Sequence, residues 1–181
     1  MRNAINVKSI HTTKNYLKML EESFLVINIP KFSFKIKEQV KEPKKTYMID
    51  TGIINALGFK FSENKGRLYE NVVCTHLMRK QSQNPELETY YYKDYQGHEA
   101  DFVIKEKAKI KAIIQVCYCL DDEATRARET RSLLHASQEL KCKNLLVITQ
   151  DREEETKAKG KKIKFTPLWK WLLESQPKEL R

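Results

Sequence analysis

The stretch GHEADFVIKEKAKIKAIIQVC, residues 97–117, decides the fold class of this 181-residue chain. Its first half predicts a strand over residues 99–106, and its second half predicts another over residues 109–120. The apolar pair Ile113 and Ile114 at the centre of the second strand indicates burial on both faces of a sheet. A strand buried on both faces needs helices above and below it, so the stretch predicts an α/β fold.

The flanking sequence supplies those helices and more strands. Residues 66–81 have the apolar periodicity of an amphipathic helix, and either Asp121 or Asp122 can cap a long helix that ends near Leu140. Further strands are expected over residues 88–94, 144–149 and 161–165, with a last helix over residues 168–174. The expected core is a mixed sheet flanked by helices.

The N-terminal part predicts a separate small unit. A helix is expected over residues 9–22, followed by an apolar strand over 24–29 and an alternating strand over 32–37, with a break at Pro30. A helix followed by a basic β-hairpin resembles the last part of a winged helix-turn-helix. We therefore expect a partial winged helix over residues 1–42 and the α/β domain over residues 43–181, with a short strand at 46–49 near its start.

The charge balance favours a polyanionic partner. Lys and Arg number 34 against 24 Asp and Glu, which gives a formal charge of +10. DNA or RNA would suit this charge, although lysine-rich thermophile proteins reach similar values for other reasons. DNA contacts are expected from the basic residues Lys14, Lys31, Lys35, Lys37, Arg126 and Arg128. The stripe Arg126, Arg128 and Arg131 fits either a solvated helix face or a phosphate track.

Other features narrow the class of protein. No apolar run approaches the roughly 20 residues that cross a bilayer, and the N-terminus has no signal-peptide pattern, so no membrane partner and a cytoplasmic location are expected. Four cysteines without a CxxC pair indicate free thiols. Cys117, Cys119, Cys142 and His76 remain a less favoured soft-metal set. No GxxxxGKS or GxxxxGKT motif occurs, so this chain has no P-loop for ATP hydrolysis.

Four positions could carry phosphodiester chemistry. Glu70 lies in the helix 66–81, Asp101 in the strand 99–106, and Gln115 and Cys117 share one face of the next strand because they are two apart. Cleavage of a phosphodiester with Mg²⁺ or Mn²⁺ needs hard oxygen ligands and a cation near the phosphate. Carboxylates from adjacent elements meet the first need.

These segments resemble the PD-(D/E)xK nuclease superfamily. GHEADFV at 97–103 matches the first strand motif, IQVC at 114–117 occupies the second, and GRLYEN at 66–71 matches the helix. More narrowly, the chain resembles the C-terminal domain of archaeal AAA+-like (P-loop) ATPases, through residues 15–22, 43–52, 66–73, 98–103 and 167–173. The resemblance implies a restriction-endonuclease-like fold, an ATPase domain or chain as partner, and Glu70, Asp101 and Gln115 as metal ligands.

Two departures weaken the motif. Gln115 replaces the second acid with an amide, and Cys117 stands where the lysine belongs. An amide oxygen binds Mg²⁺ less well than a carboxylate, and a thiol offers no positive charge to the phosphate. Lys105 or Lys93 could substitute for the lysine.

The sequence therefore supports three hypotheses. The first is a non-catalytic nucleic-acid-binding or partner-docking module of an archaeal ATPase system, built on an inactivated nuclease fold. The second is a Mg²⁺- or Mn²⁺-dependent DNA nuclease, and the third is an oligomerisation or protein-interaction domain. Purely structural roles also remain open: Glu70 can pair with Arg67 or Lys93, Asp101 can bind a backbone amide, and His98 is expected as an exposed turn residue.

Overall fold

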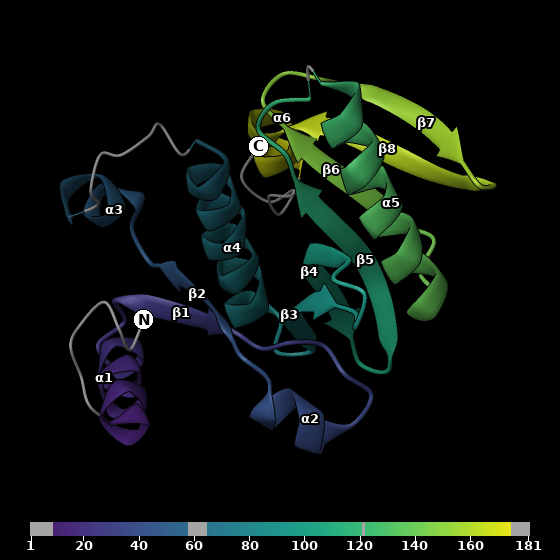
Figure 1. Ribbon diagram of the computed structural model, residues 1–181. Helices are drawn as coiled ribbons and strands as arrows, with labels where there is room; N and C mark the ends of the chain where they lie inside the picture. The colour runs from purple at the N-terminus through teal and green to yellow at the C-terminus, as the bar shows by residue number, and fades with distance from the viewer. Residues whose placement is uncertain (1–8, 58–64, 121, 175–181) are drawn as a thin grey trace.

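The computed structural model describes residues 9–57, 65–120 and 122–174, which form a six-stranded sheet with helices on both faces (Figure 1). The N-terminal elements are α1 (Ile10–Glu22), β1 (Val26–Ile29), α2 (Ile36–Lys41), β2 (Lys45–Met48) and α3 (Thr51–Leu57). The remaining elements are α4 (Lys65–Gln83), β3 (Leu87–Lys93), β4 (Glu99–Glu106), β5 (Lys109–Val116), α5 (Glu123–Glu139), β6 (Leu145–Thr149), β7 (Glu154–Ala158), β8 (Lys161–Pro167) and α6 (Leu168–Glu174).

The sheet is mixed, as the sequence predicts. Its strand order is β3-β4-β5-β6-β8-β7, with antiparallel pairing from β3 to β5, parallel pairing from β5 through β6 to β8, and an antiparallel β7 at the edge. Parallel neighbours need a crossover connection, and α5 provides it between β5 and β6. The predicted α/β class with a mixed sheet and flanking helices is confirmed.

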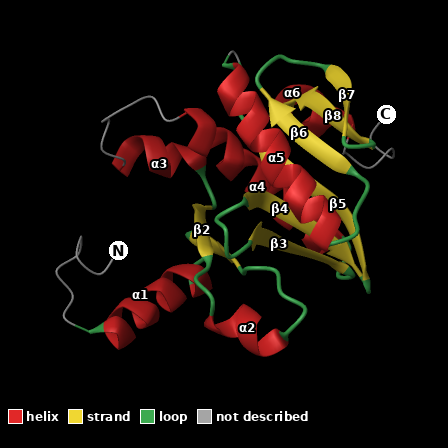
Figure 2. Ribbon diagram, turned by 45° about the vertical axis from the view of Figure 1, so that its right-hand side comes forward, coloured by secondary structure: helices red, strands yellow, loops and turns green. Residues whose placement is uncertain are grey.

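Alternating side chains of the central strands form two apolar layers. Val103 and Ile113 pack with Leu133 of α5 on one face, whereas their neighbours Phe102 and Ile114 pack with α4 and α6 on the other. Figure 2 shows α5 lying across one face of the sheet. The Ile113-Ile114 pair is thus buried on both faces, as predicted.

The predicted N-terminal hairpin is wrong. Residues 36–41 form the helix α2 instead of a strand, and β1 pairs with β2. Ser33 explains the change: its hydroxyl accepts a hydrogen bond from the Lys35 N–H and donates one to Glu38, and its carbonyl accepts one from Gln39. These local bonds offer the backbone a turn in place of a strand ladder, so the hairpin of the expected winged-helix remnant does not form.

The segment after β1 instead covers one edge of the main sheet. Pro30 accepts a hydrogen bond from the Tyr91 N–H of β3 at 3.1 Å, and the Phe32 N–H donates one to the Tyr91 carbonyl at 2.7 Å. Phe32 is buried against Tyr90 beside it. The edge strand β3 therefore gains backbone partners that an exposed edge would lack.

Strand β5 ends at Val116 rather than at the expected Leu120. Asp122, one of the two predicted caps, caps α5 by accepting from the Ala124 and Thr125 N–H groups. The charged composition of the stretch between the predicted strands 144–149 and 161–165 indicates a loop, but this stretch contains the edge strand β7, whose residues alternate between half-buried and exposed. The sequence also indicates a loop over residues 58–65, most of which lies outside the described residues.

The described helices include none that combines the length and apolar character of a membrane span. The longest of them, α4, has 19 residues but carries several charged side chains.

Replacing Leu133 with alanine tests the packing of α5. The Leu133 side chain is fully buried between α5 and the sheet, so Leu133→Ala should lower the free energy of unfolding by about 2–5 kcal/mol. Gln138→Ala on the exposed side of the same helix should change it by less than about 0.5 kcal/mol. Urea unfolding followed by circular dichroism measures both, and equal effects of the two variants would contradict the assigned face of α5.

Candidate functional site

A buried asparagine fixes strand β2 against helix α4. The Asn71 Oδ1 accepts a hydrogen bond from the Met48 N–H at 2.9 Å, and its Nδ2 donates one to the Met48 carbonyl at 2.7 Å. Because the side chain is buried and satisfies both backbone groups, it fixes the position of β2 along the helix. Lys45 and Tyr47, two apart on one face of β2, consequently lie beside Glu70.

The Lys45 ammonium lies among three carboxylates, which together with it we call the carboxylate cluster. Its Nζ is 2.7 Å from Glu99 Oε1, 2.9 Å from Asp101 Oδ1 and 3.2 Å from Glu70 Oε1. An ammonium has three N–H donors, so each carboxylate can receive one of them. The Tyr47 hydroxyl donates a further hydrogen bond to Glu70 Oε1 at 2.6 Å.

Asp101 connects the cluster to Gln115. The second Asp101 oxygen, Oδ2, accepts from the Val116 N–H at 2.9 Å, while the Asp101 N–H donates to Gln115 Oε1 at 3.3 Å. The structure therefore brings Asp101 together with Glu70 on one side and Gln115 on the other. Both Asp101 oxygens and the Gln115 carbonyl oxygen already have hydrogen-bond partners.

Burial and charge shift the pKa values of the cluster. Burial raises the pKa of Asp101 to about 6 and the negative charge of Glu70 adds to this, while Lys45 and the Val116 N–H oppose it. Burial by itself would lower the pKa of Lys45, but Asp101 and Glu70 raise it above its usual value. Burial and Glu70 raise the pKa of Tyr47 as well. At neutral pH the cluster therefore holds an ammonium, and the Tyr47 phenol beside it is neutral.

The predicted substitutes for the motif lysine lie elsewhere. Lys105 bonds to Glu88 at 2.5 Å, because the two residues are direct partners in the pairing of β3 with β4. Lys93 is half exposed and contacts only the outer oxygen of Glu99, at 3.0 Å. The Cys117 thiol packs in the core on the α5 side and donates to the Cys119 carbonyl, and burial raises its pKa to about 11.

Sequence reasoning missed Lys45, Tyr47 and Glu99. The missed signal is spacing: Lys45 and Tyr47 are two apart in one strand, as are Glu99 and Asp101 in another, so each pair shares a face. The partner of the buried acid came from β2, which sequence alone does not place beside α4.

Most of the predicted DNA contacts are dispersed. Lys31 pairs with Glu42 at 3.4 Å, Lys35 with Glu38 at 3.1 Å and Arg126 with Glu154 at 2.6 Å. Arg126 also lies over the Phe165 ring, while Lys14 and Lys37 are exposed. These ion pairs already use much of the positive charge that the sequence offers.

Arg128 has a different setting. A hollow of about 330 Å³ opens next to the carboxylate cluster, with Asp101, Gln115 and Glu99 on its sheet side. Its α5 side carries Arg128 and Arg131, of which Arg128 pairs with Glu129 at 2.7 Å. Two guanidinium groups thus line the same hollow as the candidate site residues.

Family comparisons cover nearly the whole chain. Residues 65–171 match a family described as domain of unknown function DUF4143, which is more than half of the chain. The chain belongs to the DUF4143 family. Residues 1–65 match a second family, described as domain of unknown function DUF8612. The carboxylate cluster draws Glu70, Glu99 and Asp101 from the DUF4143 segment, whereas Lys45 and Tyr47 come from the segment before it.

Two relatives extend this DUF4143 match. An uncharacterised protein of Methanocaldococcus jannaschii is 35% identical over 165 residues, which cover 88% of this chain and 35% of the relative. An uncharacterised protein of Haemophilus influenzae is 27% identical over 165 residues, covering 89% of this chain and 37% of the relative. The chain thus spans little more than a third of either relative. No solved structure is a significant match.

Removing the Lys45 charge tests the electrostatics of the cluster. In Lys45→Met only the Val116 N–H still opposes the effects of burial and Glu70 on Asp101, so the pKa of that carboxyl should rise above its present value of about 6. Unpaired carboxylates should lower stability by roughly 3 kcal/mol at pH 7. A raised carboxyl pKa costs stability as the pH climbs through it, so the loss should shrink toward pH 5.

The matched control is Lys93→Met, which removes a half-exposed ammonium from the same Glu99. It should cost less than about 1 kcal/mol at either pH. Denaturant unfolding at pH 5 and 7 measures the stabilities, and a ¹³C carboxyl titration follows Asp101. An unchanged Asp101 pKa in Lys45→Met would show that the ammonium does not neutralise the cluster.

Proposed function

We propose that this chain is a non-catalytic nucleic-acid-binding or partner-docking module of an ATPase system, built on a nuclease-like fold. The observation that carries the proposal is the Lys45 ammonium within 3.2 Å of three carboxylates. A divalent ion held by those oxygens would need the same space. The lysine supplies a positive charge there, but it cannot activate a water molecule for attack on a phosphodiester as a bound metal ion does.

The chemistry of the remaining ligands supports the loss of catalysis. Gln115 gives only an amide oxygen, and that oxygen accepts from the Asp101 N–H. In a metal-dependent nuclease, the side-chain oxygen at position 115 would have to face the metal ion. A carboxylate there would also bind Mg²⁺ more tightly than an amide does. In this proposal the site is a degenerate PD-(D/E)xK centre, in which the Lys45 ammonium offsets part of the negative charge that a metal ion would otherwise bind.

The hollow beside the cluster supports the nucleic-acid half of the proposal. Arg128 and Arg131 present two guanidinium groups on one side of it, and the chain carries a net charge of +10. Guanidinium groups bind phosphate in a bidentate manner. A phosphate backbone that follows α5 would place its oxygens against these arginines, and Arg128 would exchange its ion pair with Glu129 for one with a phosphate.

Exposed apolar side chains support the docking half. Four apolar side chains that lie between the end of α1 and the end of α2 are each more than 70% exposed: Phe24, Phe34, Ile36 and Val40. Large groups of exposed apolar side chains mark surfaces that contact another protein. The resemblance to ATPase C-terminal domains makes an ATPase domain or chain the partner we favour, and a second copy of the chain is the alternative.

A divalent-metal nuclease is the second candidate, because Glu70, Asp101 and Gln115 converge. In that case Lys45 would serve as the missing motif lysine, provided from β2. It would have to leave the carboxylates when the metal binds and turn to the phosphate. The two candidates therefore predict opposite effects of removing Lys45.

Duplex DNA binding tests the first candidate. Fluorescence anisotropy across a salt series should show log K falling linearly with log salt, since neutralised phosphates release counterions. Arg128→Ala combined with Arg131→Ala should lower the magnitude of that slope by about 2, which is the loss of two phosphate contacts.

Lys157→Ala combined with Lys159→Ala is the charge-matched control, because it removes two exposed lysines at the opposite edge of the sheet. This pair should leave the slope unchanged. Absence of binding at low salt would remove the nucleic-acid half of the proposal, and equal slopes for the two double variants would remove the hollow as the contact.

Metal binding and DNA cleavage separate the two candidates. The wild type should leave supercoiled, linear and branched DNA intact with Mg²⁺ or Mn²⁺. Lys45→Met should bind Mn²⁺ at least about tenfold more tightly than the wild type, because relief of only ~1.4 kcal/mol of charge repulsion gives that factor. Electron paramagnetic resonance of free Mn²⁺ measures the affinity. Cleavage by the wild type that disappears in both Asp101→Ala and Lys45→Met would establish the nuclease instead.

A further inference from the structure

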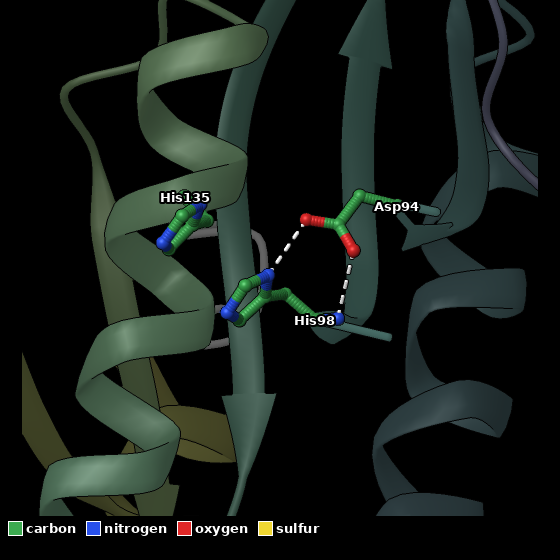
Figure 3. Close-up of side chains that lie close together, drawn as sticks. All are labelled: Asp94, His98 and His135. Atoms are coloured by element: carbon green, nitrogen blue, oxygen red, sulfur yellow. Dashed lines mark hydrogen bonds and ion pairs between the residues drawn. The ribbon is translucent and has the colours of Figure 1, made fainter. Parts of the chain in front are cut away.

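Two histidines from distant parts of the chain lie ring on ring. His98, at the end of the β3–β4 turn, and His135, in α5, have ring centroids 3.8 Å apart and planes 10° from parallel (Figure 3). Both side chains are half-buried, so the sequence expectation of an exposed His98 is wrong. The pair joins the long helix to the tip of the sheet.

The Asp94 carboxylate contacts both the backbone and the ring of His98. Its Oδ1 accepts from the Gln96 N–H at 2.8 Å and the His98 N–H at 2.9 Å, and its Oδ2 is 2.7 Å from His98 Nδ1. Burial opposes ionisation of Asp94, but the hydrogen bonds from His98 outweigh it and lower the pKa of this carboxyl. A carboxylate can only accept, so Nδ1 of His98 carries the proton, which leaves Nε2 as the ring nitrogen that can bind a metal ion.

The distances suit a metal ion. One potential ligand atom from each of Asp94, His98 and His135 lies within 4.8 Å of the other two. An ion with two imidazole nitrogens at about 2.1 Å holds those nitrogens roughly 3.4 Å apart in tetrahedral geometry. In Figure 3 each ring turns one nitrogen away from Asp94 toward the same side of the stack. Tilting the rings from the parallel stack into a V brings both lone pairs onto one ion.

We propose that His98 and His135 bind one divalent transition-metal ion, such as Zn²⁺ or Ni²⁺, with Asp94 as the carboxylate that orients His98. Histidines that bind metals commonly donate their other ring N–H to a carboxylate in this way. Imidazole ligands favour Zn²⁺, Ni²⁺ and Cu²⁺ over Mg²⁺, which prefers oxygen. Water would complete the coordination on the open side.

The ion would act as a clamp between α5 and the β3–β4 turn. His98 also lines the hollow that holds Arg128 and Arg131, so the clamp would fix one wall against the other beside the candidate phosphate contacts. The site does not depend on the carboxylate cluster, because it shares none of the four cluster residues. Its success or failure is therefore separate from that of the proposed function.

Isothermal titration with Ni²⁺ and Zn²⁺ tests the clamp. The wild type should bind one ion per chain and gain thermal stability, with no comparable binding of Mg²⁺. Asp94→Asn should weaken the affinity by roughly 10–100-fold, as loss of an orienting carboxylate does, and His135→Gln should weaken it further. The separate variant His98→Gln guards against a fold defect specific to α5, and circular dichroism checks every variant.

Two controls identify the ligands. His11→Gln removes an exposed histidine of α1 and should bind as the wild type does. Cobalt absorption distinguishes imidazole from thiol binding, because an exposed Cys119 ligand would add a thiolate charge-transfer band in the near ultraviolet. Equal Ni²⁺ affinity in wild type and His135→Gln, or a thiolate band in the Co²⁺ form, would overturn the proposal.

Discussion

One ammonium group among three carboxylates is the constraint on which the rest of this site depends. Asp101 is buried in strand β4, and a buried carboxylate lowers stability unless it is paired and hydrogen-bonded. Lys45 and the Val116 N–H supply those partners. Because Lys45 also contacts Glu70 and Glu99, one side chain of a short strand connects the helix α4 with the strand β4. Removal of the lysine would therefore affect charge and packing together.

The position of that lysine is set by parts of the chain far apart in sequence. Asn71 of α4 bonds both backbone groups of Met48, which holds β2 in place, while β1 provides the other side of the β2 ladder. The segment matched by the second family thus contributes the cation, and the DUF4143 segment contributes the acids. This arrangement suggests that the first 65 residues complete the candidate site physically, although a sequence division would place them in a separate unit. The division at residue 42 stays a prediction.

Periodicity predicted the parts of the fold whose pattern is set by burial. Helices α4 and α5 form near the expected bounds, and the Ile113-Ile114 pair is buried as expected. These predictions succeed because apolar faces and helix caps are local features of the sequence. Residues 32–37 misled, since alternation of apolar and polar residues predicted a strand where Ser33 hydrogen bonds favour a turn and a helix. A family resemblance pointed to Glu70, Asp101 and Gln115 as metal ligands, and that role stays a prediction. Lys45 was not anticipated, because no sequence rule places β2 beside α4.

The two candidate cation sites of the β3–β4 region differ in chemistry. The carboxylate cluster offers hard oxygens whose charge Lys45 partly compensates, so a metal ion there must displace an ammonium that is anchored by three contacts. The His98–His135 pair offers imidazole nitrogens, and an ion there would have to tilt the two stacked rings. The same ion cannot satisfy both preferences well. Oxygen-preferring and nitrogen-preferring metals therefore report on different sites.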